Sequence, residues 1–156
     1  MSAAKIAVVG TKAKAIDLLA PEFSITPLDG GSAAAPIGIV AIGAGAPQAL
    51  AHAAAKPETV NALALIAPPA LDGGLAAKLA GVTIPVLALF GTREANARAS
   101  SAVWRKALAN CNVTFVYDAG ADMANERPEA VAAALADFLR QRERYVVTDR
   151  SAKLYP

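Results

Sequence analysis

Residues 37–69, IGIVAIGAGAPQALAHAAAKPETVNALALIAPP, have the pattern strand, sharp turn, helix, turn, strand. The two ends are nearly continuous aliphatic runs, which is typical of parallel strands covered on both faces. The alanine-rich segment between them favours helix, and Pro47 suits a first helical turn, where a missing N–H costs nothing. This stretch therefore predicts a β-α-β unit, the building block of a parallel sheet.

Outside this unit, aliphatic runs continue to alternate with helix-like segments. The expected strands are 6–10, Phe23–Pro27, Ile37–Ile42, 62–67, 85–90 and 113–117, and the expected helices are 12–19, 47–56, 97–109 and 128–142. Such alternation predicts an α/β fold: a single domain with a mostly parallel six-stranded sheet and flanking helices. The loop at 30–36, GGSAAAP, is too short for a helical crossover. There we expect the chain to reverse the order of the sheet or to join a non-neighbouring strand.

Composition narrows the class of protein further. The 156 residues are 55% hydrophobic, but much of this is alanine, and the longest apolar runs fall well short of the ~20 residues of a spanning helix. One cysteine, Cys111, excludes an internal disulfide and multi-cysteine zinc patterns. The net charge of +2 comes from scattered residues. We therefore expect a cytoplasmic protein without membrane insertion, nucleic-acid binding, metal or cofactor.

The domain is expected to span residues 1–142, followed by a polar C-terminal tail at 143–156. The tail carries a few apolar and aromatic residues, namely Tyr145, Val146, Val147 and Tyr155. Such a segment is either disordered or held by a partner surface.

Three segments, in order, resemble the α/β-hydrolase family. Residues 37–69 resemble the region of the catalytic serine, with its small-x-Ser-x-Gly turn and a later strand ending in a proline pair; the serine position falls on Gly43. The segment IPVLALFGTREANA resembles the strand that delivers the catalytic acid, here Glu94. The segment VTFVYDAGADMANERPEAVAAALADFL resembles the final strand, the histidine loop and the closing helix, with the histidine position on Ala121.

This resemblance implies a reduced, catalytically degenerate member of the family. Glycine and alanine can act neither as nucleophile nor as base. The backbone N–H of Ala44 would remain as one oxyanion donor, but the family's His-Gly motif is absent near residues 10–12. The segment 71–82 replaces the usual lid. We therefore expect a minimal, lidless core that acts as a binding or assembly subunit, with a protein partner or as a homo-oligomer, and with a possible small anionic or acyl ligand.

Two other functions stay open at this point. The first is a hydrolase of small ester or acyl substrates with a non-standard site, drawn from Glu94, Asp118, Asp122 or Cys111. The second is anion or nucleotide binding at the turn after residue 42, because a glycine turn before a helix presents N–H groups to anions. Its candidate residues are Thr11, Lys12, Gly43, Ala44 and Gly45.

The remaining candidates have simpler interpretations. His52, the only histidine, falls in the middle of an expected helix and away from the turn, which favours a surface or partly packed role. Cys111 has no base near it in the sequence and is interpreted as a packed thiol. Trp104 lies on the expected helix 97–109 and is interpreted as a packing or interface aromatic.

Overall fold

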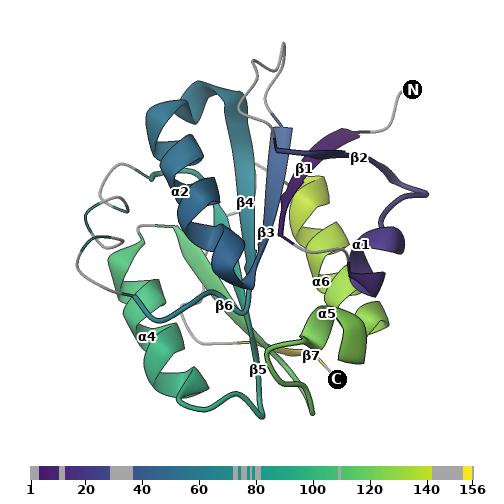
Figure 1. Ribbon diagram of the computed structural model, residues 1–156, viewed down its shortest axis with the longest axis vertical. Coiled ribbons are helices and arrows are strands. Elements are labelled where there is room, and N and C mark those ends of the chain that lie inside the picture. The colour runs from purple at the N-terminus through teal and green to yellow at the C-terminus, as the bar shows by residue number, and fades with distance from the viewer. Residues whose placement is uncertain are drawn as a thin grey trace.

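The chain folds around one parallel β-sheet, shown in Figure 1. The computed structural model describes residues 4–10, 13–28, 37–71, 74, 77, 79, 82–108, 110–141 and 153–155. The strands run in the order β2-β1-β3-β4-β5-β6-β7, and each neighbouring pair is parallel. Their bounds are Ala4–Val9, Phe23–Pro27, Ile37–Ile42, Val60–Ile66, Val86–Gly91, Cys111–Val116 and Lys153–Tyr155 for β1 to β7.

The strands β1 to β6 correspond to the six expected from the sequence, so the α/β class with a parallel sheet is confirmed. The additional strand β7 pairs with β6, with Tyr155 opposite Val116. This strand lies within the expected tail. Tyr155 therefore extends the sheet of its own chain, whereas the sequence led us to expect that it docks on a neighbouring molecule. The other apolar tail residues, Tyr145, Val146 and Val147, lie outside the described residues.

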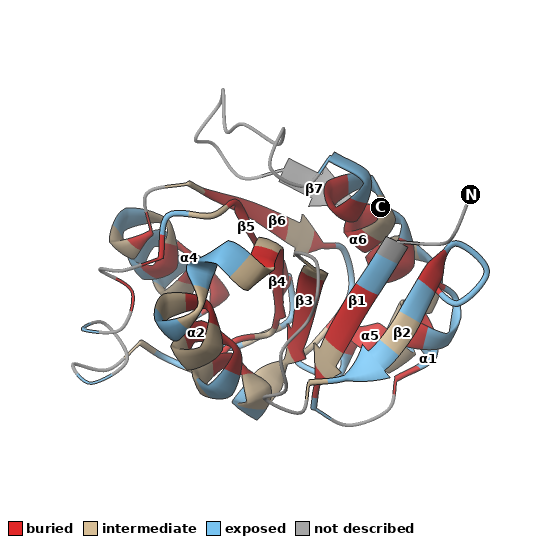
Figure 2. Ribbon diagram, turned by 90° about the horizontal axis from the view of Figure 1, so that it is seen from above, coloured by how far each residue is buried: buried red, intermediate tan, exposed pale blue. Residues whose placement is uncertain are grey.

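Helices cover both faces of the sheet (Figure 1). On one face lie α1 (Lys14–Asp17), α5 (Met123–Glu126) and α6 (Pro128–Gln141), and on the other lie α2 (Ala46–Ala55) and α4 (Ala97–Ala107). Strand residues alternate between the two layers: Val40 packs in the cluster that contains α6, and Ile39 packs in the cluster that contains α2. Because β3, β4 and β5 lie between both layers, their aliphatic runs are almost wholly buried, as Figure 2 shows.

The order of the sheet reverses around β1. β2 lies on one side of β1 and β3 on the other, so the chain passes from β2 to a strand that is not its neighbour. This is the connection that the short loop at 30–36 predicted, although residues 29–36 themselves lie outside the described residues. In open parallel sheets, ligands bind outside the carboxyl ends of the strands near such a reversal. This edge, called the carboxyl edge below, is therefore where a functional site is expected.

Among the described residues, no helix covers β2 on the face that α2 covers elsewhere (Figure 1). The sequence led us to expect exposed apolar surface there, available to a partner. Instead, Ser24 and Thr26 are exposed on this strand, and Lys5 is exposed on the neighbouring strand (Figure 2). On this face the described exposed side chains of β1 and β2 are polar, so they give no support to an interface at this corner.

Within the described residues, no helix is long and apolar enough to cross a bilayer.

Candidate functional site

Gly43 lies in a tight turn directly after β3. The 3-10 turn η1 spans Gly43–Gly45 and runs into α2, and we call residues 43–45 the elbow. The φ angle of Gly43 is +53°, a left-handed conformation that glycine adopts without steric cost. A Cβ built at this position would meet nothing within 4 Å. The backbone here is therefore unusual, yet a side chain at position 43 would have open space in front of it.

Gly45, two residues further on, is tightly packed. A Cβ at this position would lie 2.8 Å from the carbonyl oxygen of Val9, at the end of β1. Real Cβ atoms essentially never come so close to backbone, so the elbow lies directly against the end of β1 only because residue 45 lacks a side chain. This close approach gives a physical reason for the small residue that ends the family's turn motif.

Glu94 and Ala121 lie in the loops that follow β5 and β6. Since β3, β5 and β6 are parallel and these residues come after the strand ends, all three positions lie at the carboxyl edge. The expected placement of Gly43, Glu94 and Ala121 at one edge of the sheet is thus observed. The roles assigned to them by resemblance are a separate question.

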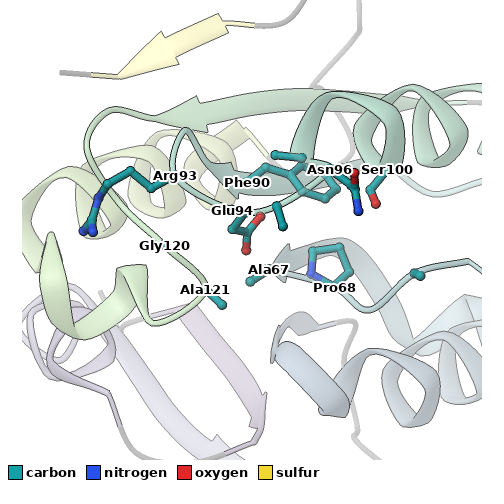
Figure 3. Close-up of a pocket in the computed structure, with 12 residues that line it drawn as sticks. Ala67, Pro68, Phe90, Arg93, Glu94, Asn96, Ser100, Gly120 and Ala121 are labelled. Atoms are coloured by element: carbon teal, nitrogen blue, oxygen red, sulfur yellow. The ribbon is translucent and has the colours of Figure 1, made fainter.

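A pocket of about 520 Å³ opens at this edge (Figure 3). It lies between the loop after β4 and the loop after β5, and the loop after β6 closes one side. Its walls are mostly small or apolar side chains, and its polar lining includes a carboxylate, an amide and a hydroxyl. The lining residues are Ala67, Pro68, Ala70, Phe90, Arg93, Glu94, Ala95, Asn96, Ala97, Ser100, Gly120 and Ala121. The volume falls within the range of small-molecule sites.

Glu94 directs its carboxylate into the pocket, toward Ala67 and Ala121 in Figure 3. The residue is half-buried, and this burial raises the pKa of its carboxyl group, an effect that a hydrogen bond with the Gly91 backbone partly offsets. The ion pairs among the described residues join Arg93 to Asp118 and Glu126, and Arg140 to Glu22. Within that part of the chain, then, no cationic side chain pairs with Glu94.

Arg93 lines the pocket, but its guanidinium is held away from Glu94 (Figure 3). Its Nη2 lies 2.8 Å from Oε2 of Glu126, and its Nε lies 3.2 Å from Oδ1 of Asp118. The other oxygen of Glu126 accepts a 3.0 Å hydrogen bond from the backbone N–H of Gly120. The Arg93–Asp118–Glu126 network therefore fixes the loop after β5 to the loop after β6.

The sequence did not predict this network or the shape of the pocket. Asn96 and Asp118 in these loops have positive φ angles. Their residue types could have indicated this from the sequence, because asparagine and aspartate tolerate the left-handed region better than most residues. Ala67 also has a positive φ, of 49°, and nothing in its residue type indicates it. Trp104 is fully buried and donates a 3.2 Å hydrogen bond from Nε1 to the Pro69 carbonyl, which confirms its packing role.

Several sequence candidates do not join the pocket. Cys111 is the first residue of β6, so it is buried at the opposite edge of the sheet, as its interpretation as a packed thiol implies, and it does not line the pocket. His52 lies in the second half of α2, where its Nε2 lies 3.5 Å from the Thr59 hydroxyl. Asp122 accepts a hydrogen bond from Asn125. Among the described residues, no group of three His, Cys, Asp or Glu could hold a metal ion.

Anion binding at the elbow stays a prediction, because the structure describes only part of the candidate site. The N–H of Ala46 already donates to the Gly43 carbonyl, and Pro47 has no N–H. The elbow's own Ala44 is exposed, with its neighbours Gly43 and Gly45 partly so. Thr11 and Lys12, the other candidates for this site, lie outside the described residues.

No protein-family model matches the sequence, and no curated protein matches it. Solved structures do match in fold. An enol-lactonase from Burkholderia xenovorans LB400 superposes with a TM-score of 0.72 at 13% identity, over 90% of this chain and 92% of the other. A dienelactone hydrolase from Anabaena variabilis ATCC 29413 gives 0.70 at 14% identity, over 92% and 88%. A serine hydrolase involved in carbazole degradation gives 0.73 at 14% identity, over 90% and 92%. The chain therefore has the α/β-hydrolase fold.

Proposed function

We propose that this protein is a non-catalytic α/β-hydrolase-fold protein that acts by binding, as a receptor for a ligand or as a subunit of an assembly. One observation carries the proposal: the carboxyl edge keeps a pocket, while two of the three positions matched to catalytic residues are Gly43 and Ala121. Neither residue has a side chain that can attack a substrate or move a proton. The third position, Glu94, has a carboxylate but neither of its usual partners.

The rest of the pocket supports the same proposal. Among the described residues that line it, Ser100 has the one hydroxyl, and no histidine is present. His52 lies at the far end of α2 from the elbow and cannot serve as its base. A pocket without nucleophile–base pair can still bind, because its walls and polar groups do not depend on the lost chemistry.

Turnover of nitrophenyl acetate and butyrate by the purified chain tests this proposal. We expect rates at the buffer background, because covalent catalysis and proton transfer are both lost. The double variant Gly43→Ser with Ala121→His restores both groups and should give at most feeble activity, since the lid and the second oxyanion donor are not restored. Wild-type turnover well above background that survives further purification would overturn the proposal.

The second candidate is a hydrolase of small ester or acyl substrates with a non-standard site. The observation that favours it is the half-buried Glu94, because a carboxyl group with a raised pKa suits general acid–base work. In that case wild-type turnover would be measurable and Glu94→Gln would remove it. Glu58→Gln, an exposed glutamate in η2 (Pro57–Thr59), is the matched control.

Assembly with a partner or with a second copy stays a prediction, as does a cytoplasmic location. The large hydrophobic side chains exposed among the described residues are Leu18, Val103 and Tyr117, each on a different segment. Such scattered residues are normal for a protein surface and do not indicate an interface. Binding at the pocket is therefore the part of the proposal with the more specific structural support.

A further inference from the structure

We propose that the carboxyl-edge pocket binds a primary ammonium group carried on an apolar stem, with Glu94 as its anchoring carboxylate. This inference rests on the proposed binding function and names the class of ligand. Three features of the described residues support it: the charge of the site, the ion pairs of Arg93, and the chemistry of the pocket walls.

The pocket has an excess of negative charge. Glu94 faces its interior, and Asp118 and Glu126 lie just outside, in the network with Arg93. These three carboxylates and one guanidinium leave a formal excess of two negative charges. This excess disfavours an anionic ligand in this pocket, whereas the anion binding considered from the sequence was placed at the elbow.

The guanidinium of Arg93 already has partners within the chain. It forms ion pairs with Asp118 and Glu126 and donates a 3.2 Å hydrogen bond to the carbonyl of Asp118. It therefore cannot also neutralise Glu94, towards which it does not point (Figure 3). A half-buried carboxylate that has no cationic partner among the described residues gains most from a ligand that brings the cation.

The side chains that line the pocket determine which kind of molecule can carry the ammonium group. Around Glu94 lie the apolar side chains of Ala67, Pro68 and Phe90, which can cover a short aliphatic or aromatic stem. Asn96 and Ser100 lie together at one end of the pocket in Figure 3 and can accept hydrogen bonds from the ammonium or from a polar substituent of the stem. An ammonium has three donors, so Glu94 leaves some of them for these groups.

Two sources could supply this chemistry: a free amine, or a lysine side chain of another protein. Titration of the ¹⁵N-labelled chain, followed by amide chemical shifts, tests both. The probes are phenethylamine and the peptide acetyl-Ala-Lys-Ala-amide, with 3-phenylpropionate and 2-phenylethanol as the charge-reversed and neutral controls. We expect phenethylamine to bind with a Kd in the millimolar range, as for a fragment of this size, and to shift the amides of residues 91–97 and 120–121.

The control compounds and the variants separate the contribution of charge to binding from the contribution of pocket shape. The acid and the alcohol should bind about tenfold more weakly or not at all, and Glu94→Gln should weaken the amine about tenfold, because both changes remove the charge-assisted contact. Ala121→Leu should weaken all probes by filling the pocket, and Glu58→Gln should change nothing. Unshifted amides outside the pocket establish that each variant is folded.

The outcomes are distinct from those of the esterase test. Tighter binding of the peptide than of phenethylamine would assign the ammonium to a partner's lysine, and the reverse order to a free amine; either supports the site. Equal binding of amine, alcohol and acid, or amine binding unchanged in Glu94→Gln, would overturn it. That failure would leave the absence of catalysis untouched, since the titration measures no turnover.

Discussion

The elbow after β3 and the paired loops after β5 and β6 lie at the same edge of the sheet, but different forces hold them. The elbow is held by packing: Gly45 brings its backbone against Val9 with no room for a Cβ. The loops are held by polar contacts, with Arg93 joined to Asp118 and Glu126 and the Thr92 hydroxyl accepting the N–H of Asp118. Packing needs no functional side chain, so the shape of the elbow does not depend on a nucleophile at position 43. The loops, in contrast, depend on their own charged residues.

The largest change in the free energy of unfolding is expected for substitutions at the elbow. Gly45→Ala should destabilise the fold by about 2–3 kcal/mol, because the new methyl group overlaps the backbone of Val9 and something must shift. Gly43→Ala makes the same change two residues away, in open space, and should cost only about 1 kcal/mol for its left-handed φ. Urea unfolding of both variants measures the difference. Equal losses would mean that packing against β1 does not hold the elbow.

A smaller effect is expected in the loops. Arg93→Gln should cost up to about 1 kcal/mol, since its pairs are partly exposed to solvent, and the loss should shrink at high salt. Arg140→Gln, which removes a single exposed pair with Glu22, is the matched control and should cost less. Hydrogen exchange at the Gly120 N–H should accelerate only in Arg93→Gln, because that amide depends on Glu126 being held in place. Unchanged exchange would show that the network does not fix the loops.

The smallest effect is expected at Glu94 and depends on pH. Burial holds the pKa of its carboxyl group above the unfolded value, so the folded chain binds the proton more tightly than the unfolded chain. Ionised Glu94 therefore lowers the free energy of unfolding at neutral pH. This penalty disappears as the pH falls below the pKa of Glu94 in both the folded and the unfolded chain. Glu94→Gln should accordingly be slightly more stable than wild type at pH 7 and equal to it in acid. If the variant is less stable than wild type at pH 7, the claim that burial of the Glu94 carboxylate destabilises the fold is wrong.

The parallel sheet was predictable because its signal is local. Each buried strand carries its own aliphatic run, as in LALI of β4, and the proline at position 47 marks a helix start. The elbow was also predictable, since its glycines and the following helix are contiguous in the sequence. β7 was missed because its three residues, KLY, have no strand pattern of their own and depend on pairing with β6.

The pocket could not be predicted because its parts are distant in the sequence. Arg93 and Glu126 are 33 residues apart, and neither residue type indicates the other. Glu94 lines the pocket together with the loop after β4 and Ala121, whose contribution is small size and not a functional group. Sequence therefore indicated which residues stand at the three matched positions, while the arrangement of charges around the pocket needed the structure.

Intact-mass spectrometry after incubation with a fluorophosphonate probe tests the central claim most directly, because the probe reports an activated serine nucleophile without any assumption about the substrate. We predict that the wild-type chain keeps its unmodified mass under conditions that fully label an active serine hydrolase, since Gly43 has no side chain to react and the pocket has no histidine to activate Ser100. A single stoichiometric adduct on a serine, Ser100 above all, would contradict the account.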